Sequence, residues 1–216
     1  MTTLNTLRVL FEDELRDVYD AEKQILKALP KIVKATTDED LRVALSGHFE
    51  ETKGQVERLV QAFESLDLKP KGKHCAGMAG ILEEGSDTLQ EDAEDSVMDA
   101  MLIAGAQRVE HYEITAYGTC IAWAEALGLT EVSEILGESL AEEKAADEKL
   151  SALAESGIND AATAGESEDE MEDEMESGSR STGSSEQAGA SARAASSANR
   201  SSSSPKSAAR QRGGRR

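Results

Sequence analysis

Four long segments of this chain carry apolar residues at every third or fourth position, which is the pattern of an amphipathic helix. They span about residues 4–35, 38–66, 87–127 and 130–157. Helices of this kind must bury their apolar stripes against one another, because no strand pattern offers a sheet to pack on. The sequence therefore predicts an all-α domain built as a four-helix bundle.

The lengths of the connections predict how the four helices are arranged. The links near residue 36 and between residues 127 and 130 are short, so each should join two antiparallel helices. The link over residues 67–86 is longer and has room for a short helix near residues 75–84. Two helical hairpins joined by a long crossover are the ferritin-like arrangement.

Individual residues mark where the helices should begin and end. Thr37 or Asp38 is expected to cap the second helix, and Thr130 the fourth. Gly128 is suited to end the third helix. Pro30 is expected to kink or interrupt the last turns of the first helix.

The composition changes near residue 160, where large apolar residues almost disappear. We predict a bundle over residues 1–160 and a disordered tail over residues 161–216, acidic at first and then rich in Ser and Arg. The formal net charge of -20 makes nucleic acid an unsuitable ligand for the bundle, because phosphate would be repelled, and it is also compatible with a high-salt environment. The basic end of the tail could contact DNA or RNA, although it lacks aromatic residues for stacking, or could fold back on the acidic bundle.

Two cysteines, Cys75 and Cys120, are too few for a disulfide framework and do not have zinc-site spacing. No apolar run approaches the roughly 18 residues of a membrane span. The N-terminal residues lack the basic and apolar regions of a signal peptide. We therefore expect a cytoplasmic protein that does not enter a membrane.

Carboxylates interrupt the apolar stripe of each helix near its middle. Glu22 lies on the first stripe and Glu51 on the second, and Glu143 on the fourth. The third stripe contains both Glu110 and Glu113. Glu22 lies 14 residues before residue 36 and Glu51 lies 15 after it, while Glu113 and Glu143 lie about 15 residues from the second turn, so all should share one layer.

Burying several carboxylates together would cost more than the usual stability of a domain, about 5–15 kcal/mol, unless they are protonated, paired with bases or bound to metal. The stripes offer few bases, of which Arg108 is the nearest. Oxygen-rich sites suit iron or manganese. The sequence thus predicts two Fe or Mn ions, against the alternative that single glutamates curl toward solvent. The predicted ligands are Glu22, Glu51, Glu110, Glu113, Glu143 and Asp147, with Gln55, His48, Tyr19 and Tyr117 as further ligands or as partners that orient them. For His48 and the two tyrosines, an ordinary buried role is the alternative.

Several stretches resemble the YciE/YciF family of ferritin-like stress proteins. They are ELRDVYDAEKQILKALPK (14–31), HFEETKGQVERLVQAF (48–63), KHCAGMAGILEEG (73–85), AQRVEHYEITAYG (106–118) and EEKAADEKL (142–150). The resemblance covers about residues 4–156 and implies a rubrerythrin-like bundle with a di-iron or di-manganese centre, found in a homodimer. The chain departs from the wider ferritin-like pattern, because Gly54 and Ala146 stand where Glu-x-x-His motifs would place histidine.

Two functions follow as hypotheses. The first is metal-dependent protection against stress, in which the centre oxidises Fe(II) or removes peroxide, with O2 or peroxide as the small-molecule substrate. The second is a non-catalytic stress protein whose metal ions fasten the helices together. Storage of iron in a large cage is disfavoured, because residues 157–165 do not continue into a short fifth helix.

Overall fold

The computed structural model describes residues 5–164, and within them every regular element is helical. The predicted all-α ferritin-like bundle is confirmed. The elements are α1 (Leu7–Ala35), α2 (Glu39–Ser65), α3 (Ala76–Thr88), α4 (Asp95–Ala126), α5 (Thr130–Leu153) and a short π-helix, η1 (Ala154–Ile158). Of the predicted disordered tail, residues 165–216 lie outside the described residues, whereas residues 161–164 are helical. No helix in the described part is long and apolar enough to cross a membrane.

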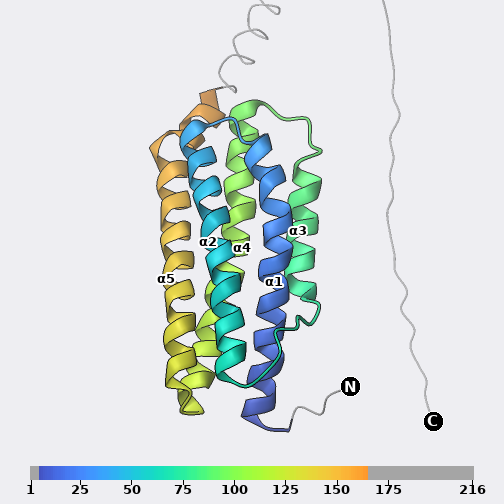
Figure 1. Cartoon of the computed structure of the whole chain (residues 1–216). Helices are drawn as coiled ribbons and strands as arrows, with labels where there is room; N and C mark the ends of the chain where they lie inside the picture. Colours follow the sequence, from blue (N-terminus) through green and yellow to red (C-terminus); the bar gives the residue numbers. More distant parts are fainter. Residues whose placement is uncertain (1–4, 165–216) are drawn as a thin grey trace, which may run out of the picture. The chain divides into compact units, whose positions relative to one another are not determined.

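The four long helices pack side by side as two hairpins, α1 with α2 and α4 with α5 (Figure 1). The crossover between the hairpins contains α3, which lies against α1 and α4. It therefore covers one side of the bundle, while α2 and α5 form the side opposite α3.

The apolar core is divided along the bundle axis. One cluster includes Phe11, Leu59 and Leu136, near the α4–α5 turn. Another includes Leu45 and Leu150, near the α1–α2 turn. The buried polar residues in the middle of the helices lie between these two clusters, so apolar side chains cover them at both ends.

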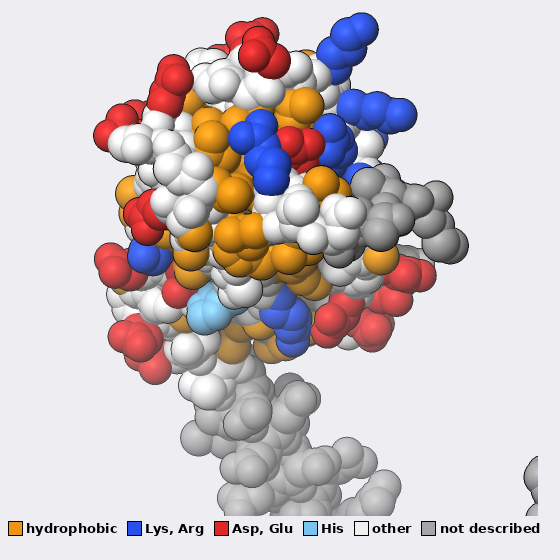
Figure 2. All heavy atoms as spheres, turned by 90° about the horizontal axis from the view of Figure 1, so that it is seen from below, with side chains coloured by type: hydrophobic (Ala, Val, Ile, Leu, Met, Phe, Trp, Pro, Cys, Tyr) orange, Lys and Arg blue, Asp and Glu red, His pale blue; other side chains and the backbone are white. Residues whose placement is uncertain are grey.

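The end of the bundle that carries the α4–α5 turn is shown in Figure 2. Hydrophobic side chains gather at the centre of this face, and most of the acidic side chains lie around its edge. Leu7, the first residue of α1, is 37% exposed and is therefore one of the exposed large apolar residues of the described chain.

Helix boundaries agree with the sequence signals at some positions and differ at others. Asp38 caps α2, where its Oδ1 accepts a 2.8 Å hydrogen bond from the amide of Leu41. Gly128 has a φ of 71°, the left-handed conformation that favours glycine after a helix. Thr130 is the first residue of α5 and makes no cap hydrogen bond, so that expectation was wrong. Helix α1 runs through Pro30 to Ala35, so the expected interruption was also wrong.

Helix α4 begins at Asp95 rather than near residue 87, because α3 continues to Thr88 and a loop follows it. This change places Asp99 in the first turns of α4, where it is 2% exposed. Its carboxylate accepts hydrogen bonds from the Thr37 amide at 2.9 Å, the Thr37 hydroxyl at 2.5 Å and the Asp38 amide at 2.7 Å. One side chain of the second hairpin thus fixes the turn of the first.

Replacing this anchor should destabilise the bundle. Asp99→Ala leaves two backbone amides without their charged acceptor, so we expect the free energy of unfolding to fall by about 3 kcal/mol. Urea denaturation followed by circular dichroism measures it. Asp92→Ala, in the exposed loop before α4, is the control. Equal stability of the two variants would contradict this role of Asp99.

Candidate metal centre

The first carboxylate of the centre comes from the middle of α1. Glu22 is fully buried, and its Oε1 accepts a hydrogen bond from the hydroxyl of Tyr117 on α4. Its Oε2 has no hydrogen-bond partner in the described part of the chain. Tyr117 is itself fully buried, so this contact holds one oxygen of Glu22 and leaves the other available to a ligand.

Helix α2 turns His48, Thr52 and Gln55 into the bundle. These positions are spaced four and three residues apart, which places them on one helical face. The amide nitrogen of Gln55 donates to Oε1 of Glu143 on α5, and also to Oε2 of Glu142 at 3.0 Å. Gln55 therefore positions a carboxylate of the facing helix.

Helices α4 and α5 provide three more buried carboxylates. Glu110 and Glu113 are 2% and 1% exposed, and Glu143 is fully buried. The three-residue spacing of Glu110 and Glu113 brings both onto the same side of α4.

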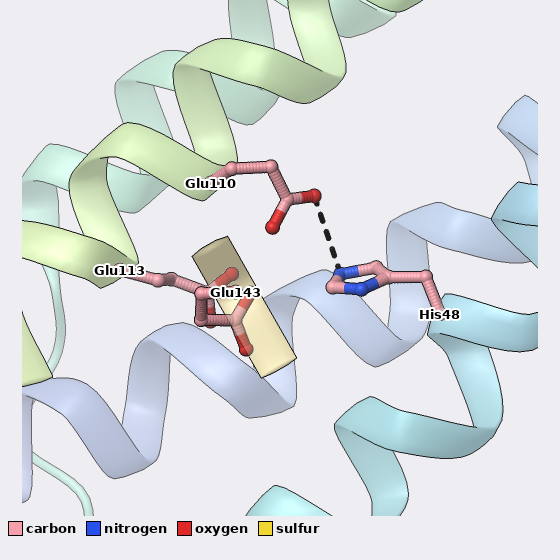
Figure 3. Close-up of side chains that lie close together, drawn as sticks. All are labelled: His48, Glu110, Glu113 and Glu143. Atoms are coloured by element: carbon pink, nitrogen blue, oxygen red, sulfur yellow. Dashed lines mark ion pairs between the residues drawn. The ribbon is translucent and has the colours of Figure 1, made fainter. Parts of the chain in front are cut away.

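Four of these side chains converge from three helices (Figure 3). His48, Glu110, Glu113 and Glu143 each offer a ligand atom, and these atoms all lie within 4.8 Å of one another. Nε2 of His48 is 3.4 Å from Oε1 of Glu110. Carboxylate oxygens and one imidazole nitrogen form a donor set that suits iron or manganese.

Most ligand atoms of this cluster have no hydrogen-bond partner within the described chain. They are both ring nitrogens of His48, both oxygens of Glu113, and Oε2 of Glu110 and of Glu143. Buried polar atoms are usually paired, because each unpaired one costs about 1–3 kcal/mol. An ion bound at the centre would give these atoms the partner that they lack.

Burial changes the acidity of the cluster. Burial, and after it the neighbouring Glu143, raises the pKa of Glu22 to about 8. Burial and contact with Glu143 raise the pKa of Glu110 to about 11. Burial also raises the pKa of Glu113 well above its ordinary value, and that of Glu143. Without a cation, Glu22 and Glu110 therefore favour their protonated forms near neutral pH.

Two arginines, Arg108 and Arg58, do not pair with the buried carboxylates. Arg108 is the base nearest to the predicted ligands along the apolar stripes. Its side chain is 52% exposed, and its Nη1 lies 3.7 Å from Oε1 of Glu84. Arg58 pairs with Glu142 and donates to Ser139 at 3.0 Å. Among the nearby bases, only His48 approaches a carboxylate of the described cluster, Glu110, at 3.4 Å, so protonation and metal binding remain the states that fit the other carboxylates.

Three residues proposed from the sequence lie outside the group of buried side chains described above. The side chain of Glu51 is 50% exposed, because it lies on the flank of α2 rather than on the face that carries His48 and Gln55. Asp147 accepts a 3.0 Å hydrogen bond from Gln107 and is partly exposed. Tyr19 packs edge-on against Phe63, with ring centroids 5.7 Å apart.

His48 is one of the four converging residues, whereas the sequence suggested it only as a further ligand or as a residue that orients one. Its side chain is 6% exposed, and it is the one nitrogen donor in the cluster. The signal was present in the sequence, since His48, Thr52 and Gln55 share a stripe with Leu41, Leu45 and Leu59. The choice between His48 and Glu51 depended on the rotation of α2, which the three-residue step between them leaves ambiguous.

Comparison with known proteins identifies relatives over the helical part of the chain. A family model described as a domain of unknown function, DUF892, matches residues 6–163. Protein YciF of Escherichia coli strain K12 is 45% identical over 157 residues, which are 72% of this chain and 95% of that protein.

Solved structures also match the helical part of the chain. The crystal structure of the E. coli stress protein YciF matches with a TM-score of 0.70 and 44% identity, over 72% of this chain and 99% of that one. YcfI of Rhodopseudomonas palustris, for which a structural role is proposed, matches with a TM-score of 0.68 and 46% identity, over 70% and 98%. A Xanthomonas campestris protein at 21% identity, with a TM-score of 0.59 over 75% and 99%, shares the fold. The chain therefore belongs to the YciE/YciF family of ferritin-like proteins, which share the DUF892 domain.

Proposed function

We propose that this protein holds two iron or manganese ions between its carboxylates and protects the cell under stress by oxidising Fe(II) or removing peroxide. The observation that carries the proposal is the convergence of His48, Glu110, Glu113 and Glu143, with their unpaired ligand atoms within 4.8 Å of one another. The name of the E. coli relative as a stress protein agrees with such a role.

The donor set suggests how two ions would be held. His48 of α2 and Glu110 of α4 would serve one ion, and Glu22 of α1 the other. Glu113 and Glu143 would provide the remaining carboxylates of the donor set. Inward-facing glutamates from several helices are the ligands of ferritin-like di-metal centres.

Bound iron or manganese would supply the redox chemistry for O2 or peroxide. The protein's own residues would prepare the site. Tyr117 and Gln55 fix one oxygen each of Glu22 and Glu143, and apolar clusters cover the site toward both ends of the bundle. A buried donor set of this kind strengthens electrostatic attraction to a cation.

The alternative is a structural stress protein in which the metal only fastens the helices. The structural role proposed for the R. palustris relative favours it. Ligands from three helices would join the hairpins in either case, so stability alone does not separate the two functions. Turnover does, because a fastening site needs no redox change.

Removing one carboxylate of α4 should separate fold from catalysis. We expect Glu113→Ala and Glu110→Ala to keep the helical fold and to slow metal-dependent Fe(II) oxidation by about 100-fold or more. Losing a residue that only orients a metal ligand costs up to about 100-fold in activity, and losing the ligand itself should cost at least as much. An oxygen-consumption assay beside melting curves measures both properties. Glu125→Ala, an exposed glutamate on the same helix, is the control. Oxidation absent from the unaltered protein, or unchanged in both variants, would leave the structural function.

Protons and metal ions compete for this centre, which gives stability a characteristic dependence on pH. In the metal-free protein, the folded pKa values of Glu22 and Glu110 lie above the ordinary value of 4.5. The folded state then holds more protons than the unfolded state above pH 4.5, so stability falls as the pH rises toward about 8. Metal binding needs deprotonated ligands and should offset this loss.

We therefore expect the chelator-treated protein to lose at least about 2 kcal/mol of unfolding free energy between pH 5.5 and pH 8. Added Mn(II) should reduce or reverse the loss. Glu22→Gln should also reduce it, since that side chain no longer titrates. Urea denaturation at the two pH values, with and without metal, makes the measurement. Metal-free protein that is equally stable at both would show that the buried carboxyls do not titrate in this range.

A further inference from the structure

A cavity of about 110 Å³ lies between α2 and α5, beside the metal centre. Its inner end is formed by His48 of α2 and Glu110 of α4, which are 5% and 2% exposed. Its outer end includes Gly47, Glu51 and Ala145, which are exposed. The cavity therefore connects the surface to two residues of the cluster.

The inner end presents ligand atoms that nothing in the described chain occupies. Both ring nitrogens of His48 and Oε2 of Glu110 are buried and have no hydrogen-bond partner among residues 5–164. A volume of this size holds several water molecules, at roughly 10–15 Å³ for each. A partly hydrated metal ion would fit.

A carboxylate stands at the outer end. The side chain of Glu51 is 50% exposed, and its Oε2 lies 3.8 Å from Nδ1 of His48. His48 in turn reaches Glu110, at 3.4 Å through Nε2 (Figure 3). Glu142 and Lys149 also line the cavity, so the mouth carries charges of both signs.

We propose that this cavity is the route by which divalent metal ions reach the centre, and that Glu51 binds each ion at the mouth before it passes to His48 and Glu110. The inference rests on the proposed metal function and adds the route and the receiving residue. Apolar clusters close both ends of the bundle, and α3 packs against α1 and α4. A neutral substrate such as O2 would gain nothing from a carboxylate at the mouth, whereas a cation would.

Small side chains keep the mouth open. Gly47 lies inside α2, where glycine is disfavoured relative to alanine, and a Cβ added there would meet no atom within 4 Å. A larger residue at this position would thus extend over the mouth without disturbing the backbone. This allows the route to be narrowed in a protein that still folds.

The test follows uptake of Co(II) by the chelator-treated full chain, using the absorbance that Co(II) gains when protein ligands bind it. Gly47→Leu should slow both uptake and chelator-driven release several-fold and leave the amount bound at saturation unchanged, because a barrier acts in both directions. Gly137→Leu is the matched control, since that glycine lies on α5, does not line the cavity, and also has open space at its Cβ. Its rates should equal those of the unaltered protein.

Glu51→Gln tests the receiving residue. Uptake should slow by about tenfold, and less so at high salt, with the final amount of Co(II) unchanged. Faster release with weaker binding would instead make Glu51 a permanent ligand and overturn its proposed role. Equal uptake rates in Gly47→Leu, Gly137→Leu and the unaltered protein would overturn the route alone. Absence of Co(II) uptake by the unaltered protein would contradict the metal function and the route together.

Discussion

The arrangement of this bundle depends on the cost of placing several carboxylates in an apolar interior. Glu22, Glu110, Glu113 and Glu143 lie between two hydrophobic clusters and are almost free of contact with bases. Their raised pKa values reflect that cost, since burial is the largest cause in each case. Such a centre has two stable forms, one that holds protons and one that holds cations, and the surrounding helices must tolerate both.

The rest of the fold serves to hold this layer in place. Each hairpin supplies part of the ligand set, and contacts between hairpins fix their register. Asp99 joins α4 to the α1–α2 turn at one end of the bundle, and Gln55 joins α2 to α5 beside the centre. Tyr117 joins α4 to Glu22 of α1. These contacts fix the two hairpins against each other, which the long crossover alone would not do.

Much of this could be predicted from the sequence, because helical periodicity and chain length determine depth along a bundle. Glu22, Glu113 and Glu143 were placed in one layer by counting residues from the turns, and the structure buries all three. Rotation about a helix axis is harder to predict. On α2, His48 and Glu51 are three residues apart, so a small rotation decides which of them enters the interior. Asp99 could not be found, because the start of α4 depended on how far α3 extends. Pro30 does not interrupt α1, because the packing of this helix along its length outweighs one missing backbone hydrogen bond.

Metal analysis is the most direct test of the account. The full chain would be stripped with chelator, exposed to Fe(II) or Mn(II) without oxygen, freed of unbound metal and examined by elemental analysis. The account predicts about two ions per chain, as expected for a ferritin-like carboxylate centre, and fewer in a Glu113→Ala variant. Repeated reconstitution that leaves no bound transition metal would contradict it, and the buried carboxylates would then have to be explained by protons alone.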